Sequence, residues 1–197
     1  MNDSPIADLI KLLARLPGIG AKSGARLAYF LVDRKDRYPE ELARAILEVR
    51  ENVRACPVCG TPSTTSPCHF CQDQDRDHST IMVVETPQDQ DAVESTKKYQ
   101  GLYHVLGGTL SPMAGKGPDS LRIKELTKRL ENEALQEIII ATNPSSEGVA
   151  TAAYLTELIQ NTATGLSITR LARGVPAGAD IKYSDPLSLE LAISERK

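Results

Sequence analysis

The sequence predicts an α/β protein in which a doubly wound, mostly parallel sheet follows a small all-α module and a four-cysteine module. Three observations predict this fold class. Apolar residues at helical spacing fill residues 4–54, and all four cysteines fall within residues 55–78. From residue 79 onward, short apolar runs alternate with helical stretches. That alternation is typical of a parallel sheet with helices on both sides.

The first module, residues 1–54, should contain three helices. Ser4 is a suitable N-cap and Pro5 suits the first helical position, so the first helix is expected to begin there. Pro17-Gly18-Ile19-Gly20 interrupts the helical pattern. The predicted helices cover about residues 5–16, 22–32 and 39–53.

The hairpin between the first two helices, Leu16–Lys22, has the composition of an anion site. Gly18 and Gly20 allow backbone N–H groups to point outward at the start of a helix, where the helix dipole also favours a phosphate. Such a contact reads no base sequence. From Arg15 to Arg37 the chain has six basic and two acidic residues, a local surplus of four positive charges. The alternative is an ordinary helical corner with a solvated charged face.

The second module, residues 55–78, contains Cys56-x2-Cys59 and Cys68-x2-Cys71, separated by eight residues. Two such pairs can wrap a tetrahedral metal, and four thiolates leave no open position, so the expected cofactor is one structural zinc ion. Redox pairs or four free thiols are the alternatives. His69 lies inside the second pair but is expected at the surface, because four thiols already complete the shell.

The third module, residues 79–175, carries the predicted sheet, and residues 176–197 form a C-terminal segment. The Gly-rich stretch 107–117 is expected to be a long functional loop. Predicted strands cover 81–84, 103–106, 138–141 and 166–169, and predicted helices cover about 87–95, 119–132 and 146–160.

Three acidic residues follow the strands of this sheet. Glu85 and Asp89 come after the first strand, and Glu147 comes after the third. Because the carboxyl ends of parallel strands converge in one crevice, these side chains could share a Mg²⁺ site. Two-metal phosphoryl transfer would require more carboxylates. The alternative is that Asp89 and Glu147 are acids of helical first turns, where they are favoured without a metal.

Composition limits the function classes. The chain has 197 residues, 41% of them hydrophobic, and a net charge of −3, so it does not coat nucleic acid by bulk charge. Aromatic residues make up 4%, with no Trp, which argues against stacking one base after another. The start of the chain does not resemble a signal peptide, and no apolar run reaches the ~20 residues of a membrane span, so a cytoplasmic protein is expected.

Motifs along nearly the whole chain resemble one family. Leu16-Pro17-Gly18-Ile19-Gly20, with Lys22-Ser23, resembles the helix-hairpin-helix of the bacterial recombination proteins RecR, and the four-cysteine module resembles the zinc motif of that family. Motifs that resemble its Toprim domain are Val84–Pro87, Tyr103–Gly108, Leu110–Pro112, Ala141–Pro144, Glu147–Gly148 and Thr169–Pro176.

The resemblance implies a Toprim-type, Rossmann-like sheet and a non-enzymatic function. RecR-like proteins act with RecO and RecF in gap repair, helping to load RecA on single-stranded DNA coated by single-strand-binding protein. They assemble from dimers into ring-like tetramers through N- and C-terminal regions. By this resemblance Lys22 and Arg26 would contact DNA. Glu85 and Asp89 would lie in the Toprim crevice, which faces RecO.

The chain departs from the family pattern at several positions. Val149 stands where the family usually has an acid, Lys97 where a glycine is expected, and Lys116 where an apolar residue is expected. Asn143 and Ser145 occupy the positions of the Asp-x-Asp motif of Toprim enzymes, so the catalytic version is expected to be absent. The alternatives are a small Toprim nuclease that uses Mg²⁺ and a scaffold without DNA contact.

Overall fold

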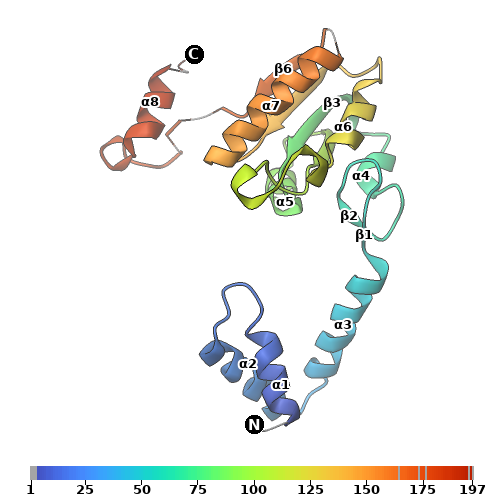
Figure 1. The fold of residues 1–197 in the computed structure, drawn as a ribbon, viewed down its shortest axis with the longest axis vertical. Helices are drawn as coiled ribbons and strands as arrows, with labels where there is room; N and C mark the ends of the chain where they lie inside the picture. Colours follow the sequence, from blue (N-terminus) through green and yellow to red (C-terminus); the bar gives the residue numbers. More distant parts are fainter. Residues whose placement is uncertain (1–3, 164, 173, 176, 195, 197) are drawn as a thin grey trace. The chain divides into compact units, whose positions relative to one another are not determined.

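The computed structural model describes residues 4–163, 165–172, 174–175, 177–194 and 196. The chain divides into two compact units, residues 1–53 and residues 54–197, called here the N-terminal unit and the sheet unit (Figure 1). Arg173 and Pro176, which belong to the last family motif, lie outside the described residues.

The N-terminal unit contains α1 (Pro5–Leu13), α2 (Ala21–Asp33) and α3 (Tyr38–Asn52). The Ser4 side chain caps α1 by accepting a hydrogen bond from the N–H of Ala7, as the sequence predicted. The predicted end at Leu16 was wrong by three residues. The N–H groups of Arg15 and Leu16 instead bond three residues back, which forms a tighter turn before Pro17.

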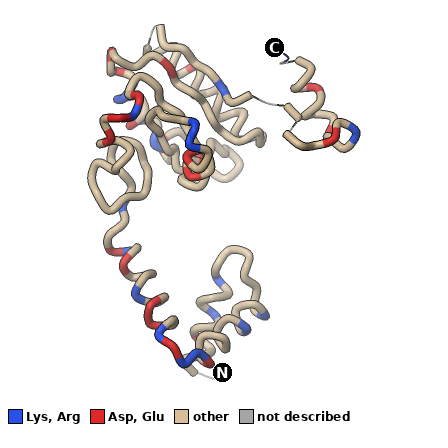
Figure 2. Tube along the Cα trace, turned by 180° about the vertical axis from the view of Figure 1, so that it is seen from behind, with Lys and Arg blue, Asp and Glu red and all other residues tan. Residues whose placement is uncertain are grey.

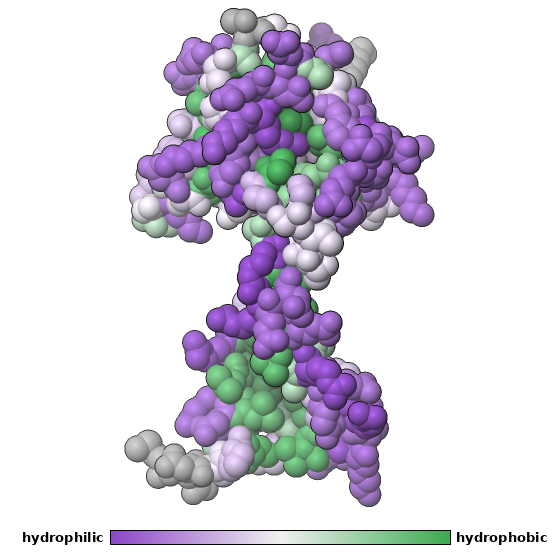
Figure 3. Space-filling view, turned by 90° about the vertical axis from the view of Figure 1, so that its right-hand side faces the viewer, coloured by the Kyte–Doolittle hydropathy of each residue, from purple (hydrophilic) through white to green (hydrophobic). Residues whose placement is uncertain are grey.

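A buried glycine brings α1 and α2 together. A Cβ on Gly24 would lie 3.1 Å from the backbone oxygen of Ile10 and 3.2 Å from the backbone nitrogen of Ala14. Ala28, one turn further along α2, is also buried. Many larger apolar side chains of this unit stay exposed: Leu12, Leu16, Tyr29, Phe30, Val32, Tyr38, Ile46, Leu47 and Val49. Figure 3 shows apolar surface gathered on this unit.

The sheet unit begins with the cysteine module. Strands β1 (Arg54–Ala55) and β2 (Pro62–Ser63) form a short antiparallel pair, and α4 (His69–Gln72) follows. The sequence did not predict these elements, because each is too short to produce a periodic pattern.

Four parallel strands form the main sheet in the order β4-β3-β5-β6. They are β3 (Asp77–Val84), β4 (Gly101–Val105), β5 (Glu137–Ala141) and β6 (Ser167–Arg170). Each lies within a few residues of its predicted position, so the α/β fold class is confirmed. Their carboxyl ends lie at one edge, which is where this architecture places ligands.

The helices of the sheet unit are α5 (Pro87–Ser95), α6 (Ile123–Leu130), α7 (Ser146–Thr162) and α8 (Pro186–Ser194), with short 3-10 turns η1 (Pro112–Ala114), η2 (Pro118–Ser120) and η3 (Ile181–Tyr183). The predicted helix at 119–132 was too long, since Leu121 is extended and interrupts it after η2. Within 107–117, the backbones of Ser111 and Lys116 pair with each other. No helix in the described part of the chain has both the length and the apolar character to cross a bilayer.

Alternate residues of the strands enter two separate cores, as expected for a sheet covered on both faces. Ile81 and Val83 of β3 pack with α6 and α7 on one face. Met82 and Val84 pack on the other face, with Tyr103 of β4 and with three of the four cysteines. The cysteine module therefore does not stand apart from the sheet but shares a core with it.

Candidate zinc centre and nucleic-acid interface

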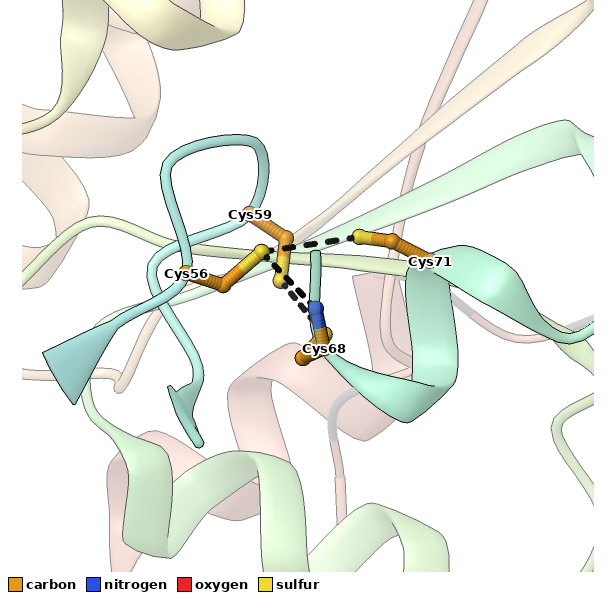
Figure 4. A group of neighbouring side chains, drawn as sticks. All are labelled: Cys56, Cys59, Cys68 and Cys71. Carbon is orange, nitrogen blue, oxygen red and sulfur yellow. Dashed lines mark hydrogen bonds between the residues drawn. The ribbon is translucent and has the colours of Figure 1, made fainter. Parts of the chain in front are cut away.

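The four cysteines converge on one point (Figure 4). Cys56 and Cys59 lie at the loop between β1 and β2, Cys68 precedes α4, and Cys71 lies within α4. All four Sγ atoms lie within 4.8 Å of one another, with Cys59 and Cys68 3.3 Å apart and Cys56 and Cys71 4.0 Å apart. Zn–S bonds of about 2.3 Å in a tetrahedron require sulfurs about 3.8 Å apart. The geometry therefore fits a zinc ion.

Zinc binds cysteine as the thiolate, and the surroundings act differently on the individual thiols. The backbone N–H of Cys68 donates to the Sγ of Cys56 at 3.4 Å. Hydrogen bonds, first from Cys71 and then from Thr61, lower the pKa of the Cys59 thiol to about 4. Burial raises the pKa of Cys68 to about 11, and the hydrogen bond with Cys59 raises the pKa of Cys71. Gly60 closes the first knuckle at φ +82°, and a Cβ there would lie 2.5 Å from the carbonyl oxygen of Val105. A side chain larger than hydrogen would therefore separate the knuckle from the sheet.

Two arginines, Arg122 and Arg129, lie next to the cysteine module. The Arg122 guanidinium donates to the carbonyl oxygens of Cys56 at 3.2 Å and Pro57 at 3.1 Å. Arg129 of α6 donates to the carbonyl oxygen of Tyr103 at 2.5 Å and, with Cys71, lines a hollow of about 260 Å³. Zinc held by four thiolates has a net negative charge, so nearby cations stabilise it. His69 is exposed and packs on the Phe70 ring, outside the cysteine cluster.

The hairpin presents an uncapped helix end. Gly18 has φ +76°, which glycine adopts readily, and Gly20 is the N-cap of α2 with no side-chain hydrogen bond to the helix. Lys22 and Arg26 are exposed and lie four residues apart, on the same side of α2. Neither forms an ion pair with any described residue. Figure 2 shows Lys and Arg on this unit. The arrangement suits a phosphate group.

The three acids predicted in the Toprim crevice differ in burial and in hydrogen bonding. Glu85 is buried at the end of β3, and its carboxylate accepts hydrogen bonds from the N–H of Asn143 at 2.7 Å and from its amide at 2.8 Å. The Asp89 carboxylate accepts a hydrogen bond from the backbone N–H of Thr86, which caps α5, and its other oxygen lies 3.5 Å from the side-chain amide nitrogen of Asn143. Glu147 is exposed in the first turn of α7, and its carboxylate has no hydrogen bond or ion pair with described residues.

This edge of the sheet also carries a cavity of about 420 Å³. Asp89, Asn143 and Arg170 line it among mostly apolar side chains, and Val149 is one of these. The cysteines form the one group of at least three metal-ligating side chains among the residues that the structure describes, so the crevice acids form no such group.

Sequence reasoning did not identify several buried polar groups, since single residues of these types give no pattern. Thr61 lies beside Cys59, Gln90 lies beside Thr61, and His104 lies in the interior of the sheet unit. Burial, and then the Arg129 charge, lower the pKa of His104 to about 3, so its ring is neutral at pH 7. The ring nitrogen Nε2 lies 2.8 Å from the carbonyl oxygen of Arg122 and donates to it.

Family models match all three modules. They are a RecR helix-hairpin-helix at residues 6–50, a RecR four-cysteine zinc finger domain at residues 53–73 and a Toprim domain at residues 79–172. A recombination protein RecR from Pelotomaculum thermopropionicum is 48% identical over 193 residues, which cover 98% of this chain and 96% of the relative.

The chain belongs to the RecR family. The resemblance stated from the motifs is confirmed, as are the helix-hairpin-helix, the zinc-finger and the Toprim modules. RecR proteins from Enterococcus faecalis and Cutibacterium acnes are 45% and 46% identical over 193 and 196 residues, which cover 98% and 100% of this chain and 96% of each relative.

Proposed function

We propose that this RecR-family chain is a DNA-binding recombination mediator in gap repair, which acts with RecO and RecF to promote RecA loading on single-stranded gaps. The observation that supports it best is the succession of three RecR modules within a chain related to RecR proteins over its full length. In this proposal the chain organises DNA and partner proteins and does not cleave DNA. Its zinc ion is structural, because four thiolates leave no position for water or substrate.

The proposed DNA contact is the hairpin with the first turns of α2. Gly18 and Gly20 leave backbone N–H groups accessible at the helix start, and Lys22 and Arg26 add two cations without acidic partners among the described residues. These groups recognise phosphate and not base edges, which agrees with binding that is independent of sequence. The net charge of −3 supports contact at this local site over a general attraction.

The Toprim crevice is proposed as the RecO-binding site. The Glu85 carboxylate already accepts two hydrogen bonds from Asn143, and Glu147 forms no hydrogen bond with Glu85. Few carboxylate oxygens of the crevice are therefore arranged to hold Mg²⁺ together. A largely apolar cavity with a few polar groups is instead suited to a protein side chain.

The proposed assembly is a homo-oligomer in which the exposed apolar face of the N-terminal unit contacts a second copy. Monomeric proteins rarely expose so many large apolar side chains on one small unit. A ring of several weak hairpin sites around one duplex raises the effective concentration of each site, which compensates for the acidity of the chain.

The DNA contact is tested with a Lys22→Ala/Arg26→Ala variant and gapped duplex over a salt series. Each lost phosphate contact lowers the slope of log affinity against log salt by about 0.9, so the slope should fall by about 2 for the two cations of one chain. A Lys124→Ala/Lys128→Ala variant of α6 is the control, with the same change in charge. Unchanged affinity and slope in the hairpin variant would remove the assignment.

The absence of catalysis is tested separately. The purified chain is incubated with nicked and gapped DNA and Mg²⁺, and the mediator hypothesis expects intact DNA. Specific cleavage that disappears in Glu85→Gln would identify a Toprim nuclease instead. Gel filtration with RecO and gapped duplex distinguishes a mediator from a scaffold, since a scaffold would co-elute with RecO but not with DNA.

A further inference from the structure

Two buried polar side chains form a chain of contacts that ends at a zinc ligand. Thr61 is 6% exposed and Gln90, from α5, is fully buried. The Thr61 hydroxyl lies 3.1 Å from the Sγ of Cys59 and 2.9 Å from the amide oxygen of Gln90. The amide nitrogen of Gln90 has no hydrogen-bond partner among the described residues, although it is fully enclosed. An unpartnered buried donor is costly, so this nitrogen requires an explanation.

The protonation state of Cys59 decides how these groups bond. A thiol can donate to the Thr61 hydroxyl, which then donates to the Gln90 oxygen and leaves the amide nitrogen unpaired. A zinc-bound thiolate can only accept, so the Thr61 hydroxyl must donate to sulfur and accept from Gln90. The nitrogen and oxygen of an amide are assigned by their hydrogen bonds. With the amide turned by a half rotation, its nitrogen donates to Thr61. The enclosed atom is then a carbonyl oxygen, a group that lacks a partner more often than an N–H does.

We propose that Gln90 and Thr61 form a hydrogen-bond relay that donates to the zinc-bound thiolate of Cys59. Helix α5 of the Toprim domain would thereby stabilise the metal bound by the zinc-finger module. This inference rests on the zinc ion proposed above.

The position of Gln90 in α5 makes the relay rigid. The preceding residue, Asp89, accepts hydrogen bonds from the backbone and the hydroxyl of Thr86 and forms the capping box of the helix. The cap fixes the backbone at Gln90, and the complete burial of its side chain restricts the rotamers, so little side-chain freedom remains to be lost when it donates to Thr61. Groups that orient or neutralise metal ligands typically change metal affinity by about 10- to 100-fold when removed.

The test compares zinc affinities by competition with a chromophoric chelator, on full-length chains loaded with zinc. Thr61→Val removes the hydroxyl and keeps the shape, and its zinc affinity should fall at least about tenfold. Thr61→Ser keeps the hydroxyl and should remain within about twofold of the unmodified chain. Thr151→Val is the matched control, because Thr151 is also fully buried and hydrogen-bonded but contacts Glu147 and Leu110 and not the cysteines.

A double-variant cycle distinguishes a relay from two independent contacts. In a relay Gln90 acts through Thr61, so Gln90→Met should weaken zinc binding in the unmodified chain but add nothing to Thr61→Val. Additive losses, or a Thr61→Val chain that binds zinc as tightly as Thr61→Ser, would overturn the proposal.

Circular dichroism of each loaded chain checks folding. If Thr61→Val does not fold, Gln90→Met alone must weaken zinc binding, or the relay is wrong. The zinc content of the unmodified chain tests the ion itself: a chain without zinc would contradict the proposed function, whereas a zinc-loaded chain insensitive to Thr61→Val would contradict only the relay.

Discussion

Lys97 adopts a backbone conformation that suits glycine. Its φ is +56°, the one positive φ of a non-glycine residue among those the structure describes. It follows α5 and the C-cap Thr96, a position where helices commonly end in the left-handed region. The family resemblance predicted a glycine at this position. The structure supplies a backbone reason for the glycine.

Replacing Lys97 with glycine should stabilise the chain. An L-residue in the left-handed region costs about 1–2 kcal/mol, and part of that gain is lost to the greater freedom of glycine in the unfolded chain. Lys97→Gly should therefore raise the free energy of unfolding by about 1 kcal/mol, as measured by urea titration. Lys97→Ala removes the same charge but keeps a Cβ, so it should give no gain. Equal stabilisation by both variants would assign the effect to charge.

At the scale of elements, the zinc module and the sheet stabilise each other. The structure shows that Cys56, Cys59 and Cys68 pack in the same core as Met82 and Tyr103 of β3 and β4. In addition, the N–H of Val105 donates to the carbonyl oxygen of Cys59 at 2.7 Å. Metal binding therefore contributes to the packing of one face of the sheet.

The packing of β4 against α6 should make stability depend on pH. Because the folded-state pKa of His104 is about 3, below its ordinary value of 6.5, the unfolded state binds the extra proton as the pH falls from 6.5 towards 3. Stability attributable to neutral His104 is complete above pH 6.5 and should be about 2 kcal/mol lower at pH 5. Urea unfolding at pH 7 and pH 5 measures this loss.

A variant that keeps the hydrogen bond but does not titrate provides the comparison. His104→Gln can still donate to the carbonyl oxygen of Arg122, so its loss of stability between pH 7 and pH 5 should be smaller than that of the unmodified chain by about 2 kcal/mol. Acid effects on the zinc thiolates are common to both chains and cancel. Identical losses in the unmodified chain and His104→Gln would contradict the assignment.

At the scale of the whole molecule, the N-terminal unit is apolar beyond what its own packing uses. Helices α1 and α3 contain no buried residue among those described, yet Ile46, Leu47 and Val49 of α3 are each about 60% exposed. Their side chains contribute little to packing within the unit. Contact with a second copy would remove this surface from water and give the apolar residues a function.

The proposed oligomer should therefore dissociate when this face carries a charge. Leu47→Glu buries a carboxylate in the proposed contact, which is unfavourable without a partner, so the molar mass measured by light scattering should fall to that of a smaller assembly. Met113→Glu is the control, since Met113 is fully exposed in the Gly-rich loop of the other unit. A Leu47→Glu chain with unchanged mass would place the interface elsewhere.

Local chemistry explains what the sequence alone determined. The two Cys-x-x-Cys pairs predict a metal site because their short spacing fixes the geometry of each knuckle. Ser4, Pro17 and the glycines of the hairpin indicate helix limits because capping and backbone restriction act within one turn. The strands at 81–84 and 138–141 were predictable because a strand buried on both faces requires a continuous apolar run.

Only the tertiary structure decided which distant polar groups meet. The sequence placed Asn143 where Toprim enzymes have an aspartate, but it did not show that Asn143 bonds to Glu85, 58 residues away. It also did not show that Thr61 bonds to Gln90, 29 residues away. For Glu147 the sequence left open a site shared with Glu85 and a place in a helical first turn, and the structure has it exposed in the first turn of α7. The register of β3 against β5 and the packing of α5 with the cysteine core determine these contacts. Such contacts depend on the packing of whole elements, which no local pattern encodes. The sequence thus determined the modules and the metal ligands, and the fold determined the polar groups that surround them.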